Sequence, residues 1–212
     1  MKRFILATAI ALSASNTIAL ENNFYLKSTY GSVDTNISSK DALESFKTKL
    51  SDSSGWSITL GYRLNKFIAL EGGFADLGDT EGSYRHEEWS FSQWGDEMSE
   101  ISTIDYKIST DTKILGLFLT TDITKDFYAG ARVGYQLWDE QFQKRHEFSA
   151  RWDWGDYHGI NTTDETNDGS DPYYGISVGW NNNNWSLSLE HTIFEMKDRK
   201  PSLSSLGLTY NF

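Results

Sequence analysis

The chain is built from short segments, each about ten residues long, in which apolar and polar residues alternate. In the segment 55–64, every second residue from Trp56 to Leu64 is large and apolar, and the residues between them are mostly small or polar. Successive side chains of a β-strand point to opposite faces, so this pattern predicts strands with one apolar face. Eight such segments follow one another: Asn23–Val33, Gly55–Leu64, Phe67–Leu77, Thr112–Ile123, Phe127–Trp138, Tyr173–Asn181, Trp185–Met196 and Ser202–Phe212.

Two kinds of connection join these segments. Those after the second, fourth and sixth are turns of a few residues, whereas those after the first, third and fifth are long, spanning 34–54, 78–111 and 139–172. Short turns on one side and long loops on the other are the rule for barrels of the bacterial outer membrane. The predicted fold is therefore all-β: an eight-stranded antiparallel up-and-down transmembrane β-barrel with long extracellular hairpin loops.

The two strand faces must be assigned to lipid and lumen. The interior of an eight-stranded barrel has room only for its own side chains. Glycine, serine and threonine fit there, and we expect stacks of Trp, Leu and Tyr to face lipid instead. Aromatic residues near the strand ends, such as Tyr62, Tyr135 and Trp180, are typical of the girdles at a membrane interface. The alternative is a secreted, water-soluble barrel of the lipocalin kind, with its apolar face inward.

The N-terminus is typical of an export signal. Lys2 and Arg3 precede an apolar run at 4–14, and small residues lead to Ala19. We expect cleavage near Ala19, which leaves residues 20–212 as the barrel; the alternative is a buried N-terminal helix. Loss of residues 1–19 leaves 17 basic and 30 acidic residues, a net charge of −13. Such a chain is a poor nucleic-acid binder, because phosphates are repelled.

The segments Gly55–Asp79 (GWSITLGYRLNKFIALEGGFADLGD) and Leu115–Trp138 (LGLFLTTDITKDFYAGARVGYQLW), with the closing SLGLTYNF, resemble the OmpA transmembrane-domain family. The resemblance covers essentially the whole mature chain. It implies a location in the bacterial outer membrane. It also implies that Leu208, Tyr210 and Phe212 form the signal read by the barrel-assembly machinery. OmpA itself continues into a periplasmic peptidoglycan-binding domain, whereas this chain stops at Phe212, so we expect a barrel-only relative.

Three charged residues, Glu71, Arg132 and Glu190, lie on the small-residue face, where such barrels carry interior charges, and alternation adds Lys27. Charges in a narrow lumen need partners, because isolated buried charge is costly. The four residues form either a fixed brace or a gate whose ion pairs exchange. Phe118 stands where barrels of the OmpA type have a lysine, and this departure argues against a gate of the OmpA kind.

Two sequence motifs bear on whether the chain has a catalytic site or a calcium site. In lipid A deacylase barrels, a histidine and a serine lie two residues apart on one outward strand face, but His191 is followed at that spacing by Ile193. We therefore expect no enzymatic activity and no cofactor. Residues 164–169 (DETNDG) resemble part of a calcium loop, but Gly175 stands where the bidentate acid is needed, so an acidic turn is the default.

The two longest connections are acidic and rich in tryptophan. Residues 79–111 hold nine acidic and two basic residues, and residues 139–171 hold nine and three. We expect the strands to continue past the bilayer as hairpins. Because the alternation at Ile104–Ile108 is out of phase with that at Leu115–Leu119, a bulge or register break is expected between them. Candidate contact residues, which could instead pack together, are Trp89, Trp94, Trp152 and Trp154.

The sequence thus favours a non-enzymatic outer-membrane barrel with a structural or surface-interaction role. A narrow gated pore for small solutes or ions is the first alternative, and a lipid A-modifying enzyme is the second. The expected partners are outer-membrane lipid and lipopolysaccharide, the barrel-assembly machinery during biogenesis, and a host, phage or other surface ligand.

Overall fold

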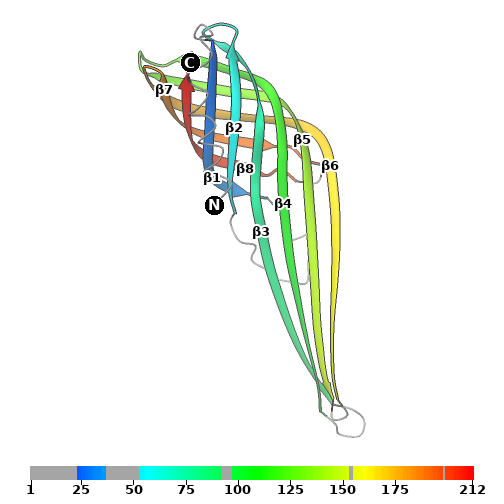
Figure 1. Ribbon diagram of the computed structural model, residues 1–212. Helices are drawn as coiled ribbons and strands as arrows, with labels where there is room; N and C mark the ends of the chain where they lie inside the picture. The colour runs from blue at the N-terminus through cyan, green and yellow to red at the C-terminus, as the bar shows by residue number, and fades with distance from the viewer. Residues whose placement is uncertain (1–22, 37–52, 92–96, 153–154, 198) are drawn as a thin grey trace.

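A computed structural model describes residues 23–36, 53–91, 97–152, 155–197 and 199–212; side chains at 88–91, 97–98 and 152 are not described. Eight strands run antiparallel and close into a barrel in chain order, with β1 pairing with β8 (Figure 1). Within the described residues, no helix is long and apolar enough to cross a membrane. The strands are β1 (Phe24–Asp34), β2 (Ser53–Arg63), β3 (Ile68–Phe91), β4 (Glu97–Asp122), β5 (Phe127–Trp152), β6 (Gly155–Asn182), β7 (Trp185–Phe194) and β8 (Ser202–Asn211).

The strands alternate between an exposed apolar face and a buried face, as the sequence predicts. Outward side chains such as Leu115, Ile176 and Leu206 are about two-thirds exposed in the isolated chain, at 63, 67 and 66 %. Their neighbours along the strands, such as Ser177 and Ser205, are buried. Apolar side chains on the outside of a closed barrel need a lipid surrounding. The predicted transmembrane barrel is confirmed, and the water-soluble alternative is wrong.

The barrel closes where the first and last strands meet. Their register runs from Tyr25↔Asn211 to Asp34↔Ser202, and the backbone N–H of Phe212 donates to the carbonyl of Phe24 at 3.1 Å. Next to this seam, the ring of Tyr210 contacts those of Trp185 and Phe212, with ring centroids 4.7 and 5.3 Å apart. The role of Leu208, Tyr210 and Phe212 as an assembly signal stays a prediction.

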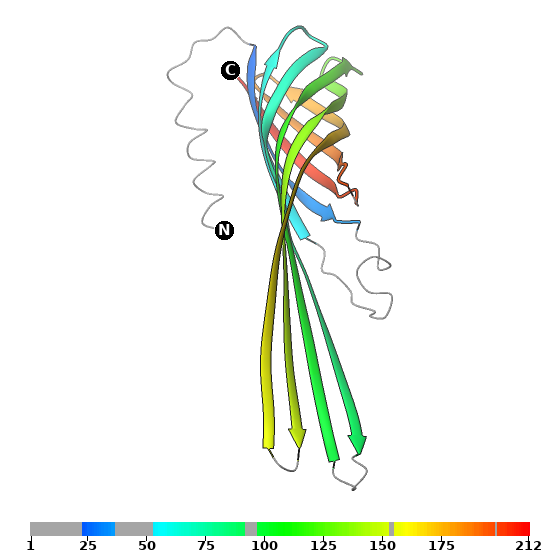
Figure 2. The same ribbon diagram turned by 90° about the vertical axis from the view of Figure 1, so that its right-hand side faces the viewer.

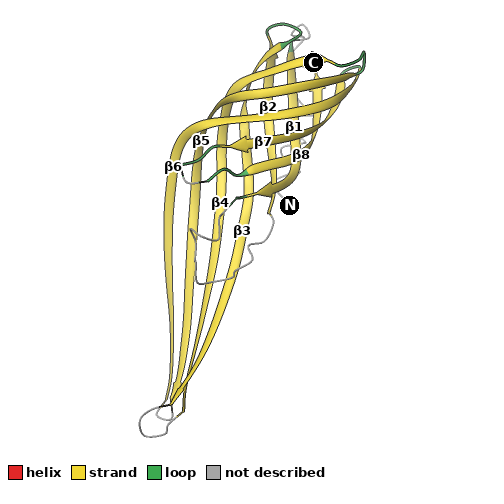
Figure 3. Cartoon of the chain, turned by 180° about the vertical axis from the view of Figure 1, so that it is seen from behind, coloured by secondary structure: helices red, strands yellow, loops and turns green. Residues whose placement is uncertain are grey.

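The strands differ greatly in length, and this difference shapes the molecule (Figure 2). β2 stops pairing with β3 at Asp76, and β7 stops pairing with β6 at Tyr173, while β3 to β6 continue as paired hairpins. The result is a twisted four-stranded sheet that extends beyond the barrel (Figure 3). We call it the projecting sheet; it comprises the described parts of 79–111 and 139–171.

A bulge does occur where the barrel passes into the projecting sheet, but on a different strand from the one expected. β4 pairs with β5 in unbroken register from Ser99 to Asp122. The register shift lies in β3, between Asp76 and Asp79, where Gly78 has a φ of +72°. A left-handed glycine is the usual first residue of such a bulge. On the β4 side this shift falls between Ser109 and Asp111, so the predicted register break lies in the expected interval, but the extra residue is in β3.

Candidate functional site: barrel lumen and projecting sheet

Four buried charged side chains meet inside the barrel. Lys27 Nζ lies 3.3 Å from Glu71 Oε1 and 3.5 Å from Glu190 Oε2. Arg132 Nε lies 3.4 Å from Glu71 Oε2, and Arg132 Nη1 lies 2.5 Å from Glu190 Oε2. All four side chains are at most 6 % exposed. We call this set the lumen network; its formal charge is zero, which limits the cost of burying it.

Neighbouring side chains complete the lumen network. The hydroxyl of Tyr25 donates to Glu71 Oε1 at 2.7 Å, and the hydroxyl of Ser188 donates to Glu190 Oε1 at 2.8 Å. The ring of Phe118 faces both cations, with Lys27 Nζ 5.4 Å and Arg132 Cζ 5.2 Å from its centroid. The aromatic ring therefore stabilises the two cations through its electron-rich face, at a position where a lysine would repel them.

Glycine makes room for these rings. A Cβ atom at Gly61 would lie about 2.0 Å from the ring of Tyr25, and one at Gly130 would lie about 2.5 Å from the ring of Phe118. Either contact is far shorter than van der Waals distance, so any larger residue would displace an aromatic ring that faces the network. The small residues of the strand pattern thus specify which large side chains the lumen can hold.

The extracellular end of the lumen is filled by an apolar plug. Tyr173 and Phe194 have stacked rings with centroids 6.0 Å apart, and they are 0 and 2 % exposed. The plug consists of Val33, Ala75, Leu77, Trp138, Tyr173, Phe194, Met196 and Leu203. The expectation that large apolar side chains are kept out of the lumen is therefore wrong at this end. The inward residues of several strands converge there, and Gly116 and Gly134 leave room for the side chain of Tyr173.

The connection between β7 and β8 fastens the plug to the longer strands. Arg199 Nη2 donates to Thr110 Oγ1 at 2.8 Å and forms an ion pair with Glu140. Gln136, which is fully buried, donates through its amide to the carbonyl of Glu195 at 2.7 Å. Residues of this connection therefore bond to β4 and β5 at the mouth. The lumen is filled with protein both at the network and at the mouth.

The projecting sheet has two unlike faces. The face continuous with the lumen, here called the inner face, carries a group of aromatic and aliphatic residues among polar ones: Tyr84, His86, Ile104, Tyr106, Ile108, Phe142, His146, Phe148 and Tyr157. Ring contacts link them across strands, with Tyr106–Phe142 centroids 5.9 Å apart and Phe148–Tyr157 centroids 5.5 Å apart. The outer face is charged and includes Asp79, Glu81, Asp105, Lys107, Asp139, Glu147, Asp156, Asp164 and Asp168.

The four tryptophans singled out from the sequence are only partly placed. Trp94 and Trp154 lie outside the described residues. Trp89 and Trp152 are described as backbone alone, paired with Ser99 and Gly155 near the far ends of β3 and β5. Their role as contact residues stays a prediction. The alternation at Ile104–Ile108 marks one strand of the inner face in the sequence, but the aromatic residues of that face are not among the predicted contact residues.

The segment that resembles a calcium loop is part of a strand. Residues 164–169 lie within β6 and pair with 138–143 of β5. Asp164 and Asp168 therefore point to the outer face and Glu165 to the inner face, so their carboxylates diverge. Within the described part of the chain, no three His, Cys, Asp or Glu residues are grouped as a metal site. The expected acidic turn is wrong, because β5 and β6 stay paired from this segment out to Trp152 and Gly155, so the chain reverses before residue 164.

A histidine–serine pair does exist on the outer wall, but between strands. His191 of β7 and Ser204 of β8 are register partners, and Nδ1 lies 2.8 Å from Oγ. Inspection of a single strand misses such a pair. Among the described residues, no carboxylate hydrogen-bonds to His191, so the acid that orients a catalytic histidine is missing from this arrangement.

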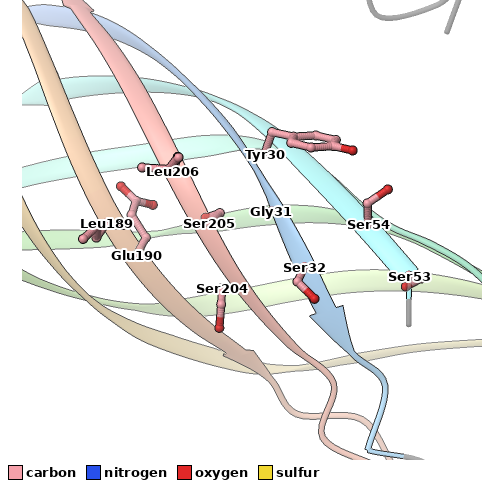
Figure 4. Close-up of a pocket in the computed structure, with 10 residues that line it drawn as sticks. All are labelled: Tyr30, Gly31, Ser32, Ser53, Ser54, Leu189, Glu190, Ser204, Ser205 and Leu206. Atoms are coloured by element: carbon pink, nitrogen blue, oxygen red, sulfur yellow. The ribbon is translucent and has the colours of Figure 1, made fainter. Parts of the chain in front are cut away.

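The groove beside this pair has a volume of about 650 Å³ and is shallow (Figure 4). Its polar lining comes from Glu190 of β7 and from serines of β1, β2 and β8, including Ser54 and Ser204. Tyr30, Leu189 and Leu206 give it apolar borders. An open groove of hydroxyl groups can contact polar headgroups, but it does not enclose a substrate.

A closed barrel with an apolar outer belt and a packed polar lumen is a transmembrane protein of the bacterial outer membrane. The chain belongs to the family described as the outer membrane protein beta-barrel domain, whose model matches residues 4–212. The suspected relationship to outer-membrane barrels is confirmed, and so is the predicted location.

Solved structures of similar fold come from other bacteria. Ail, the attachment invasion locus protein of Yersinia pestis, is 15 % identical with a TM-score of 0.50, covering 91 % of this chain and 100 % of that chain. The N-terminal barrel of Pseudomonas aeruginosa OprF is 10 % identical with a TM-score of 0.39, covering 90 % and 98 %. Pseudomonas aeruginosa OprG is 9 % identical with a TM-score of 0.44, covering 90 % and 96 %. No curated protein matches the chain in sequence.

Proposed function

We propose that this outer-membrane barrel is a non-enzymatic surface-interaction protein whose projecting sheet contacts a partner outside the cell. The observation that carries the proposal is the inner face of that sheet. Its aromatic side chains are gathered on one face, outside the barrel and beyond the apolar belt. Contiguous exposed apolar surface of this kind is characteristic of interaction sites.

The two margins of the projecting sheet add to this surface. In the described part of the chain, β3 beyond Asp76 pairs only with β4, and β6 before Pro172 pairs only with β5. Such edges offer unused backbone donors and acceptors to another chain. Lipopolysaccharide, a host surface and a phage are the partners that the location makes available.

The test compares cells that display the full chain with cells whose barrel has 80–110 and 140–170 replaced by short turns. We expect the shortened barrel to lose adhesion to host-cell surfaces or adsorption of phage while it still inserts into the outer membrane. Equal adhesion and adsorption by both chains would refute the surface role.

A gated pore is the second candidate, because each lumen cation contacts both carboxylates. Lys27 and Arg132 both lie within 3.5 Å of Glu71 and Glu190. Ion pairs arranged in this way can exchange partners. The apolar plug above them supports the closed state. In planar bilayers we expect no steady conductance from the wild-type protein, and regular channels abolished by Glu71→Gln would favour the pore.

A further inference from the structure

The inner face of the projecting sheet has an apolar centre, within which Lys144 is the register partner of Tyr106. Three consecutive rungs place Tyr84 beside Ile104, Tyr106 beside Gly82, and Ile108 beside Phe142. Further out, the rings of His146 and Phe148 lie 5.8 Å apart. Among the described residues, no strand packs against this face, and its side chains are only partly buried. The centre is therefore open to a second molecule.

Two acidic side chains border this apolar centre on the inner face. Glu100 of β4 and Glu165 of β6 are exposed on the inner face, one toward the far end and one at the margin. Across both hairpins, 79–111 and 139–171 each hold nine acidic residues, against two and three basic ones. The field around the sheet is therefore negative, and it attracts cations and repels anions.

The basic residues of the sheet are largely engaged already. On the outer face, Lys107 Nζ lies 2.7 Å from Asp79 Oδ2, and Arg145 Nη2 lies 3.3 Å from Glu147 Oε2. On the inner face, Lys144 Nζ lies 5.8 Å from the ring centroid of Tyr106. Five basic residues cannot neutralise the acidic residues of these two hairpins, so a large negative excess remains.

We propose that the inner face binds a cationic amphipathic polypeptide. Its apolar side would lie on Tyr106, Phe142 and Phe148, and its basic side chains would reach Glu100 and Glu165. The inference rests on the proposed surface role and adds the chemical class of the partner. Apolar contact supplies affinity at the centre, while complementary charge speeds association and selects against polyanions.

The probe is a synthetic amphipathic peptide of lysine and leucine, titrated against the full-length mature protein folded in zwitterionic detergent. We expect the double variant Tyr106→Thr, Phe142→Thr to bind the peptide at least tenfold more weakly. Threonine keeps the strand preference and removes the ring. Ile160→Thr, which removes an exposed apolar side chain from the outer face, is the matched control and should bind as wild type does.

Charge is tested separately. Glu100→Gln with Glu165→Gln should weaken binding several-fold, and higher salt should weaken binding by the wild type. The same peptide with glutamate in place of lysine, and heparin as a polyanion, should not bind. Far-UV circular dichroism of each variant shows that the barrel is intact.

Three results would overturn the inference: equal binding of the lysine peptide by wild type and the inner-face double variant, binding that salt leaves unchanged, or preferential binding of heparin. Failure of the proposed function has a different signature, since chains with and without the projecting sheet would then behave alike at host and phage surfaces. A sheet required for adhesion that ignores the lysine peptide would refute the partner class alone.

Discussion

Arg132 and Glu190, which are 58 residues apart in the chain, form an ion pair across the lumen with Nη1 and Oε2 at 2.5 Å. β5 and β7 carry these residues and do not pair with each other, so the contact spans the interior. Both side chains are almost completely buried, and Lys27 and Glu71 complete a neutral set. The lumen network thus ties together strands that have no backbone hydrogen bonds in common.

Removal of one cation should be costly. Arg132→Met leaves Glu71 and Glu190 with Lys27 alone, and we expect the free energy of unfolding to fall by about 3–5 kcal/mol. Urea unfolding in lipid vesicles measures the loss. The double variant Arg132→Met, Glu190→Leu leaves one neutral pair, so it should recover part of that stability. A single variant no less stable than the double variant would contradict the role of charge balance.

Phe118 should stabilise the network through its ring. Phe118→Leu keeps an apolar side chain but removes the contacts with Lys27 and Arg132, and we expect a loss of about 1 kcal/mol. A double-mutant cycle with Lys27→Met isolates the interaction, because truncation of the ring should cost less once the cation is gone. Strict additivity of the two changes would show that the ring only fills space.

Truncation of a large side chain in the apolar plug should lower the stability of the barrel. Trp138 is 7 % exposed, and its indole N–H donates to Asp171 Oδ2 at 2.8 Å. Trp138→Ala removes a buried side chain and should cost about 3–5 kcal/mol of unfolding free energy. Leu137→Ala is the neighbouring control on the lipid face, where Leu137 is 56 % exposed. A larger loss at Leu137 than at Trp138 would argue against a packed mouth.

Asp79 provides a pH test in the projecting sheet. Hydrogen bonds from Lys107 and Ser109 hold the pKa of Asp79 below its usual value. Because the folded pKa lies below the unfolded pKa, the stabilisation is present above the unfolded value and is lost as pH falls through the folded one. NMR titration should show a lowered midpoint that returns toward normal in Lys107→Met. The pair is exposed, so Asp79→Asn should cost under about 1 kcal/mol.

The His191–Ser204 pair calls for a direct assay of lipid chemistry. We expect lipid A from cells expressing wild type, Ser204→Ala or His191→Ala to give the same mass spectrum, because no described carboxylate orients the histidine. A change in acylation with the wild type that Ser204→Ala abolishes would make the barrel an acyl-modifying enzyme and would overturn the non-enzymatic proposal.

Several features could be read from the sequence because they depend on neighbours along one strand. Alternation located the barrel part of all eight strands and assigned Lys27, Glu71, Arg132 and Glu190 to one face. The short connections marked the turns between β2 and β3, β4 and β5, and β6 and β7. The pairing of His191 with Ser204 could not be predicted in this way, because the register between two strands cannot be inferred from the alternation within either strand.

The sequence by itself determined the strands, their order and their lipid-facing residues, since these follow from a period of two and from turn length. Only the tertiary structure decided why the alternation of apolar residues in β4 reverses between the barrel and the projecting sheet. The strand runs on without a break, but its outer face passes from lipid to water. Apolar residues must face outward at Leu115–Leu119 and inward at Ile104–Ile108, so the pattern inverts while β4 keeps its register with β5. Whether apolar residues face outward or inward is therefore decided by what surrounds each face of the strand, and not by the backbone.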